Sequence, residues 1–225
     1  RSLPGLGREA GGMSALARLS DMLFPTVPHV AMADAPAGLA AIADRAINLA
    51  VWQRRLSPAL AAAGQLVGQA HGDIRLAVPA PRAAVALAEA LVAANWPAVP
   101  ALVADVAELA MLAAPLMQTH AVDLRLEIVT GDACRKFHAD YVPLRLITSY
   151  AGPGSQWLSN DDAAALAQGV SVEQLEVRQL LAGEVALFKG KRLTDSPIIH
   201  RSPPIAGTGQ RRLVLVINPT QEGCC

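Results

Sequence analysis

Three residues of the chain, His138, Asp140 and His200, have the types and the spacing of a metal site. His138 and Asp140 lie two positions apart in the segment FHADY, and side chains at i and i+2 of an extended backbone project from the same face. His200 ends the apolar segment PIIH, so it can supply a third ligand from the end of a strand. Two imidazoles and one carboxylate on one face of an octahedral ion leave three positions open for a cosubstrate and O2, as in non-haem Fe(II) oxygenases. The sequence therefore predicts a metal site at these three residues.

An anionic cosubstrate such as 2-oxoglutarate needs a positively charged partner near this site, and arginine can hold a carboxylate in a bidentate fork. Arg211 and Arg212 are adjacent at the start of a predicted strand that follows His200. Because side chains alternate between the two faces of a strand, only one of the pair can point toward the metal, and the spacing from His200 favours Arg211. Arg145 could contact an acidic cosubstrate or pair with an acidic neighbour, and Tyr150 could offer its phenol to the cosubstrate or pack in the core.

Other residues near the predicted site have two interpretations each. Cys134 gives the spacing C-x3-H-x-D, which would suit zinc because thiolate is a soft ligand, although a free cysteine is more often a small buried residue. Trp157 follows the turn Gly152-Pro153-Gly154, and it either shapes the rim of the pocket or packs in the core. A basic patch later in the chain is typical of a solvated loop but would suit an anionic substrate: Lys189, Lys191 and Arg192.

The elements that must position these residues change character along the chain. In the first half, Pro58, Pro81 and Pro100 each start an apolar, alanine-rich segment, and proline is favoured in the first turn of a helix. We therefore expect helices at 58–68, at 81–95 and from 100 onward, with short strands at 47–52 and 74–78. From about residue 122, polar and apolar residues alternate as in half-buried strands, and turn signals separate the segments. The predicted strands are 123–129, 143–150, 172–180, 185–188, 197–200 and 211–217.

This pattern predicts an α+β fold. An N-terminal helical lobe at 13–120 would pack on a C-terminal double-stranded β-helix module, cupin- or jelly-roll-like, at 121–225, and the two lobes can form one folded unit. Residues 1–12, RSLPGLGREAGG, precede the first methionine and are rich in glycine. We expect them to be sequence left from cloning or an upstream extension without a fixed structure.

Composition excludes several classes of partner. The chain carries 19 basic and 19 acidic residues, so it has no global field that would attract nucleic acid or acidic lipid. Its most apolar segments are interrupted by Glu89, Pro97, Asp105 and Glu108, so they are too short for a membrane span, which needs roughly 20 mostly apolar residues, and they predict helices of a soluble protein. Three cysteines in 225 residues do not form a disulfide framework, and they favour a reducing, cytoplasmic location. The oligomeric state is left open.

The chain as a whole resembles a bacterial family of uncharacterised proteins, DUF1826, over most of residues 40–218. The segments that carry the resemblance are NLAVWQR (48–54), FHADYVPLRLITSYAGPGSQWL (137–158), VALFKG (185–190), HRSPP (200–204) and RRLVLVI (211–217). It implies a link to zinc homeostasis, because family members tend to lie near zinc-homeostasis genes, but it implies no particular reaction.

A more distant resemblance is to the cupin-like double-stranded β-helix oxygenases. It rests on the order of motifs: H-x-D, then GEVALF (183–188), then the distal histidine and an arginine. This resemblance implies an oxygenase that uses Fe(II) and 2-oxoglutarate to hydroxylate an unspecified small molecule or protein side chain. The alternative is a non-catalytic cupin-like protein that holds zinc with the same three ligands.

Overall fold

A seven-stranded sheet forms the centre of the molecule. The computed structural model describes residues 27–132 and 134–220, and the strand order in this large sheet is β1-β2-β8-β5-β10-β4-β3. All neighbouring strands are antiparallel except β1 and β2. The strands are β1 (Val30–Ala33), β2 (Leu49–Trp52), β3 (Asp73–Pro79), β4 (Ala121–Val129), β5 (Leu144–Ala151), β8 (Val185–Lys189) and β10 (Arg212–Pro219).

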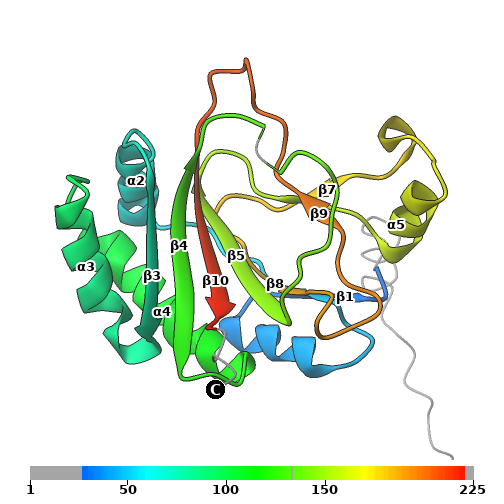
Figure 1. Ribbon diagram of the computed structural model, residues 1–225, viewed down its shortest axis with the longest axis horizontal. Coiled ribbons are helices and arrows are strands. Elements are labelled where there is room, and N and C mark those ends of the chain that lie inside the picture. The colour runs from blue at the N-terminus through cyan, green and yellow to red at the C-terminus, as the bar shows by residue number, and fades with distance from the viewer. Residues whose placement is uncertain (1–26, 133, 221–225) are drawn as a thin grey trace, which may run out of the picture.

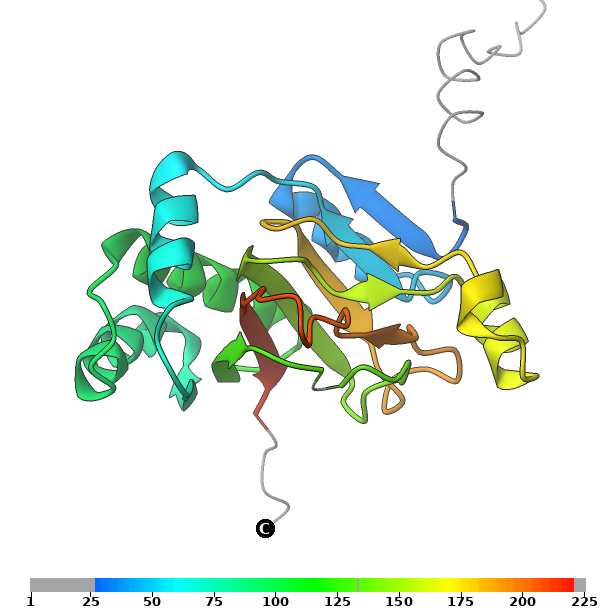
Figure 2. The same ribbon diagram turned by 90° about the horizontal axis from the view of Figure 1, so that it is seen from above.

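Helices cover one face of this sheet, as Figures 1 and 2 show. The first α-helix, α2, begins after Ser57, whose side-chain oxygen accepts a hydrogen bond from the Leu60 amide, and Pro58 lies in its first turn. Apolar residues of these helices and of the large sheet form one continuous core that includes Leu87, Leu109 and Leu126. The helical elements on this face are η1 (Pro36–Ala43), α2 (Pro58–Val67), η2 (Ala80–Arg82), α3 (Ala83–Ala93) and α4 (Pro100–Leu116).

A small three-stranded sheet lies against the other face. Its order is β7-β6-β9, and β9 pairs with β6 so that His200 lies opposite Trp157. A second core fills the space between the two sheets and includes Trp157, Phe188, Ile198 and Val214. The remaining elements are β6 (Gln156–Trp157), α5 (Asn160–Ala167), η3 (Val172–Gln174), β7 (Arg178–Gln179) and β9 (His200–Arg201).

The fold is therefore a mixed α/β structure dominated by a large antiparallel sheet, and the packing of a second, smaller sheet against it is consistent with a jelly-roll-like architecture. A separate N-terminal helical lobe is not confirmed. Strands β1, β2 and β3 come from the first half of the chain, yet they belong to the same large sheet as β4, β5, β8 and β10. Within residues 27–132 and 134–220, no helix combines the length and the hydropathy needed to cross a bilayer. The predicted extension at 1–12 lies outside the described residues.

Most of the predicted elements are present, but two predicted strands are largely wrong and a helix was missed. The segment 172–180, predicted as a strand, is the short helix η3 followed by the two-residue strand β7, and only the end of 197–200 is a strand. Helix α5 was not predicted, although Ser159 is separated from Asp162 by the spacing of a capping box. The Ser159 hydroxyl oxygen accepts a hydrogen bond from the Asp162 amide at 3.0 Å, which explains why the helix begins there.

A buried ionic cluster joins the helices to the large sheet. Arg54 donates two hydrogen bonds to the Asp105 carboxylate of α4, at 2.6 and 2.8 Å, and the Tyr150 hydroxyl donates a third at 2.6 Å. Tyr150 is fully buried in the helix-side core, and burial raises the pKa of its hydroxyl well above the usual value. The suggestion that this phenol binds a cosubstrate is thus corrected. The Tyr150 side chain projects from the face of β5 that packs on the helices, opposite to the face that carries Arg145.

Replacing Tyr150 with phenylalanine should lower the free energy of unfolding by about 1–2 kcal/mol, because a buried hydrogen bond to a charged acceptor is lost. Urea unfolding followed by circular dichroism measures the change. Tyr141→Phe is the matched control, since Tyr141 is 77% exposed, and it should leave the free energy unchanged. Equal losses in the two variants would show that the contact with Asp105 contributes nothing.

Candidate metal site

His138 and His200 are placed side by side by the backbone. The two residues form an isolated antiparallel bridge, in which each amide donates to the other's carbonyl, at 3.0 and 2.9 Å. Their rings lie 4.7 Å apart between centroids, and the Phe188 ring of β8 packs against His200 at the same distance. His200 is therefore wedged between the two sheets with a 6% exposed side chain, whereas His138 is 36% exposed and faces the mouth of the site.

Asp140 completes the group. One ligand atom from each of His138, Asp140 and His200 lies within 4.8 Å of the other two, so the predicted triad converges. The Nε2 atom of His138 lies 3.5 Å from Asp140 Oδ1, and the Nε2 atom of His200 lies 3.2 Å from Asp140 Oδ2. Adjacent ligands of an octahedral ion with bonds of about 2.1 Å are roughly 3.0 Å apart, so small side-chain movements would close the set around an ion.

Both imidazoles are oriented by backbone carbonyls. His138 Nδ1 lies 2.9 Å from the Lys136 oxygen, and His200 Nδ1 lies 3.4 Å from the Ile198 oxygen. A carbonyl oxygen can only accept, so Nδ1 carries the proton in each ring, and the Nε2 atom of the neutral ring then has a free lone pair. This is the usual way in which a second set of contacts prepares a histidine to bind a metal through Nε2.

The Asp140 carboxylate is buried, negatively charged and incompletely bonded. Burial alone would raise its pKa, but contacts with His138 and His200 and the charge of Arg145 outweigh burial and hold the pKa well below its usual range. Oδ2 lies 2.7 Å from an Arg145 guanidinium nitrogen, yet no contact with this oxygen among the described residues has hydrogen-bond geometry. An ionised oxygen in this state fits a divalent cation. The three side chains could therefore hold a metal ion.

A glycine allows the Asp140 loop to reach the site. Gly190 follows strand β8, and a Cβ atom at this position would lie 2.8 Å from the main-chain carbonyl oxygen of Asp140 and closer still to that of Val142. The next amide, that of Lys191, donates to the same Asp140 oxygen at 2.9 Å. The loop is thus fastened to the end of β8, which explains how residues far apart in the sequence hold Asp140 beside His200.

Arg212, not Arg211, lines the pocket next to the histidines, which corrects the choice made from spacing. Arg211 points to the helix side, where it donates to the carbonyls of Gly68 and Ala70 at 2.7 and 2.6 Å. Arg212 is 1% exposed and donates to Pro153 at 2.6 Å and to the Ser202 hydroxyl at 3.0 Å.

The Arg212 guanidinium lacks a carboxylate partner in the part of the chain that the structure describes. Among the described residues, no carboxylate oxygen lies within 4.0 Å of it, although the Glu127 charge is near enough to affect it. Burial lowers the pKa of Arg212 to about 10, partly offset by Glu127, so the group stays protonated at neutral pH. A buried cation without a counter-ion is costly unless an anion joins it, and this one faces the same pocket as His138 and His200.

This pocket has a volume of about 80 Å³, and some of the other predicted residues line it while others do not. Arg145 lines it and donates to the Asn218 side chain at 2.9 Å, while contacting Asp140. Cys134 also lines it as an exposed free thiol, but it is outside the group of converging ligands. Trp157 is buried in the core between the sheets and does not line the pocket. Residues that line the pocket and were missed from the sequence include Glu127, Ser155 and Ser202.

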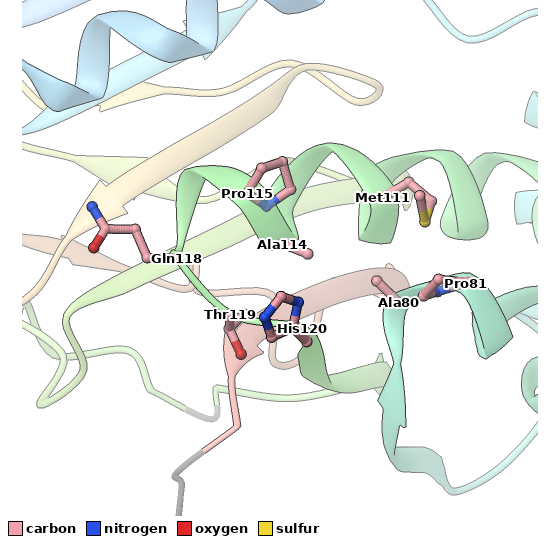
Figure 3. Close-up of a pocket in the computed structure, with 8 residues that line it drawn as sticks. All are labelled: Ala80, Pro81, Met111, Ala114, Pro115, Gln118, Thr119 and His120. Atoms are coloured by element: carbon pink, nitrogen blue, oxygen red, sulfur yellow. The ribbon is translucent and has the colours of Figure 1, made fainter.

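A separate, mainly apolar pocket of about 510 Å³ lies on the helix side of the molecule. Figure 3 shows its lining, to which α4 contributes Met111, Ala114 and Pro115 and the segment after α4 contributes His120. None of the three converging ligands lines it, so the larger hollow and the candidate metal site are distinct.

Comparison with known proteins places the chain in a family. The family model described as "Protein of unknown function (DUF1826)" matches residues 33–218, which include all three candidate ligands. The chain belongs to this family. A search of curated protein sequences finds no match to this DUF1826 protein.

Several solved structures are similar to this DUF1826 protein, including the following three. A dioxygenase for auxin oxidation from rice is 11% identical, with a TM-score of 0.47, and the match covers 81% of this chain and 77% of that chain. A putative oxygenase from Shewanella oneidensis is 12% identical, with a TM-score of 0.46 and coverage of 84% and 88%. A prolyl-4-hydroxylase from Pseudomonas putida is 16% identical, with a TM-score of 0.41 and coverage of 83% and 100%. These similarities are distant.

Metal binding by the DUF1826 protein should depend steeply on pH. Contact with the Asp140 carboxylate raises the pKa of His138 above its usual value, partly offset by burial, so a proton competes for Nε2 to a higher pH than at a free histidine. We expect the affinity for Zn²⁺, measured against a competing chelator, to fall by about tenfold for each pH unit below the pKa of His138. An affinity that stays constant between roughly pH 8 and pH 5.5 would contradict protonation of a histidine ligand.

Proposed function

We propose that this protein is an oxygenase that uses Fe(II) and 2-oxoglutarate to hydroxylate an organic substrate. The observation that supports this most strongly is that the two histidines of the converging group line the same pocket as the buried Arg212 guanidinium, which has no carboxylate partner among the described residues. The converging group suits a metal ion that keeps open positions, and the guanidinium suits the carboxylate of a dianionic cosubstrate. 2-Oxoglutarate requires both features, because one end of the molecule approaches the metal and the carboxylate at the other end requires a cation.

Each residue has a defined part in this proposal. His138, Asp140 and His200 hold Fe(II), which when bound supplies the redox chemistry that couples oxidation of 2-oxoglutarate to oxidation of the substrate. Arg212 holds the far carboxylate of the cosubstrate, and Arg145 keeps the Asp140 carboxylate in place. The balanced reaction converts substrate R–H, 2-oxoglutarate and O2 into R–OH, succinate and CO2.

The surroundings of the site support exclusion of water from it. Apolar side chains from three strands of the large sheet form its floor: Ile147 from β5, Phe188 from β8, and Val214 and Val216 from β10. These residues are between 1% and 8% exposed. A dry floor strengthens the electrostatic attraction between Arg212 and a carboxylate, since the local dielectric constant is low.

The experiment that tests the proposal is an anaerobic titration of the protein with Fe(II) and 2-oxoglutarate. A weak visible charge-transfer band should develop only when both are present, and admission of air should then yield succinate. His200→Ala should abolish both signals. Absence of the band in the wild-type protein, with no succinate formed in air, would overturn the oxygenase assignment.

A second candidate function is zinc binding without catalysis. The pocket volume of about 80 Å³ favours it, because cavities that enclose small-molecule ligands are usually roughly 300–1,000 Å³. The two functions differ in what they require of Arg212. A zinc-binding protein should bind Zn²⁺ with the same affinity whether or not 2-oxoglutarate is present, in the wild type and in Arg212→Met alike, whereas in an oxygenase 2-oxoglutarate should raise the metal affinity of the wild type and Arg212→Met should weaken that increase.

A further inference from the structure

A buried lysine faces a third pocket, on the opposite side of the large sheet from the candidate metal site. Lys189 ends strand β8, and although the sequence suggested a solvated basic loop, it is only 5% exposed. Its neighbour in the chain, Phe188, packs against His200 on the other face of the same strand. The Lys189 side chain therefore points away from the metal site, into a hollow between η1 and the C-terminal end of α4, which both lie near the bottom of the large sheet in Figure 1.

Within residues 27–132 and 134–220, the ammonium group of Lys189 has one hydrogen-bond acceptor and no ion pair. It donates to the main-chain oxygen of Asp44 at 2.5 Å, which leaves two of its three donor positions free. Among the residues that the structure describes, no carboxylate oxygen lies within 4.0 Å of it. Burial lowers the pKa of Lys189, and the charge of Asp44 offsets this only in part. A cation in this position would gain from a bound anion.

The hollow has the size and the lining of a small-molecule site. Its volume is about 660 Å³, within the range of roughly 300–1,000 Å³ that is usual for such sites. Ile42, Leu144 and Leu193 provide apolar walls, while Arg45 adds a second cation at the rim and Asp195 an opposing charge. Cations beside apolar walls match a molecule that has an anionic head and an apolar body.

We propose that this hollow, which we call the Lys189 pocket, is a binding site for a small amphiphilic carboxylate, whose head group contacts Lys189 and whose apolar body lies along Ile42, Leu144 and Leu193. The site is separate from the metal and does not depend on the proposed oxygenase function. The two sites nevertheless lie on opposite faces of the same pair of strands, β5 and β8. Leu144 pairs with Lys189 in the sheet, and the next pair in the register is Arg145 with Phe188, both of which contact the metal ligands.

Isothermal titration of the full chain with octanoate tests the proposal, with acetate and 1-octanol as probes of the head and the tail alone. Octanoate should bind with a stoichiometry of one, and acetate and 1-octanol should each bind at least about tenfold more weakly, because each lacks one half of the contacts. Lys189→Met should weaken octanoate binding by at least about tenfold, since the chain length is kept and the charge is lost. Lys191→Met, which removes an exposed charge two positions away, should bind like the wild type.

A second variant guards against a folding defect in Lys189→Met. Leu193 lines the mouth of the pocket and is 51% exposed, so Leu193→Asp should fold normally and repel the carboxylate, weakening octanoate binding. Leu181→Asp, at a 69% exposed position outside the pocket lining, is its matched control. The proposal is overturned if the wild type does not bind octanoate, if 1-octanol binds equally well, or if a folded Lys189→Met or Leu193→Asp protein binds it like its control. Metal content should be the same in all four variants, which separates this test from that of the oxygenase function.

Discussion

Asp140→Asn should lower the affinity for Fe(II) or Zn²⁺ by at least roughly 100-fold, because the substitution removes the one negative charge that the three ligands supply. The asparagine side chain keeps the shape of the aspartate, so the loop fastened to Lys191 should remain in place. The change is best measured by competition with a chelator of known affinity, at a pH above the pKa of His138. His200→Ala should have an effect of similar size, since it removes a buried ligand.

Asp161→Asn provides the control for this experiment. Asp161 is an exposed carboxylate in the first turn of α5 and lies outside the triad, so its replacement should leave metal affinity unchanged. If Asp140→Asn and Asp161→Asn bind metal equally well, the carboxylate is not a ligand. The close contact between Arg145 and Asp140 would then be an ordinary buried ion pair.

Arg212→Met should reduce the affinity of the Fe(II)-loaded protein for 2-oxoglutarate by about 30-fold or more, whereas Arg211→Met should not. Truncating one member of a buried charge pair costs roughly 2–5 kcal/mol, and each 1.4 kcal/mol is a factor of about ten. Arg212 faces the pocket, while the Arg211 guanidinium is held by two carbonyls on the helix side. Anaerobic titration of 2-oxoglutarate, followed by the visible band, gives the affinity directly.

Two further measurements make the Arg212 result specific. Arg212→Met also removes hydrogen bonds to Pro153, Ser155 and Ser202, so the melting temperature must be compared with that of Arg211→Met. Arg212→Lys keeps the charge but not the planar fork, and it should recover only part of the 2-oxoglutarate affinity. A variant that is folded, binds metal normally and retains full 2-oxoglutarate affinity would exclude Arg212 from cosubstrate binding.

The orientation of the two neighbouring arginines could not be predicted from the sequence. Strand β10 is buried on both faces, with Leu213 and Leu215 in the helix-side core and Val214 and Val216 in the core between the sheets. Its apolar residues therefore run continuously, and the alternation that would reveal the inward face is absent. The spacing from His200 was the only other guide, and it does not fix the face.

Tyr150 is different, because the information was present in the sequence. Leu144, Leu146 and Tyr150 are separated by even numbers of residues on β5, so all three side chains project from one face, opposite to Arg145. The structure places those three in the helix-side core and Arg145 in the pocket beside the metal ligands. Alternation on this strand thus identifies both the residue that reaches the site and the one that does not.

The wrong strand at 172–180 shows the limit of a local pattern. The segment contains apolar residues spaced two or three positions apart between polar ones, but only Arg178 and Gln179 pair as a strand, with Trp157 and Gln156 of β6. A strand is stable only when its backbone amides and carbonyls pair with a neighbour, and the pairing is decided by the tertiary fold. The convergence of His138, Asp140 and His200 was predicted from residue types and order, since strand ends supply the ligands. The Gly190 contact that brings the Asp140 loop into place could not be predicted.

The central claim is that His138, Asp140 and His200 bind a single metal ion, and anomalous X-ray diffraction from crystals of the Fe(II)- or Zn²⁺-loaded protein tests it most directly. We predict one anomalous peak per chain, at roughly 2.0–2.2 Å from His138 Nε2, His200 Nε2 and an Asp140 oxygen. If the anomalous peak lies elsewhere in the protein, or if no peak lies between these three side chains, the metal site and the function proposed from it are contradicted.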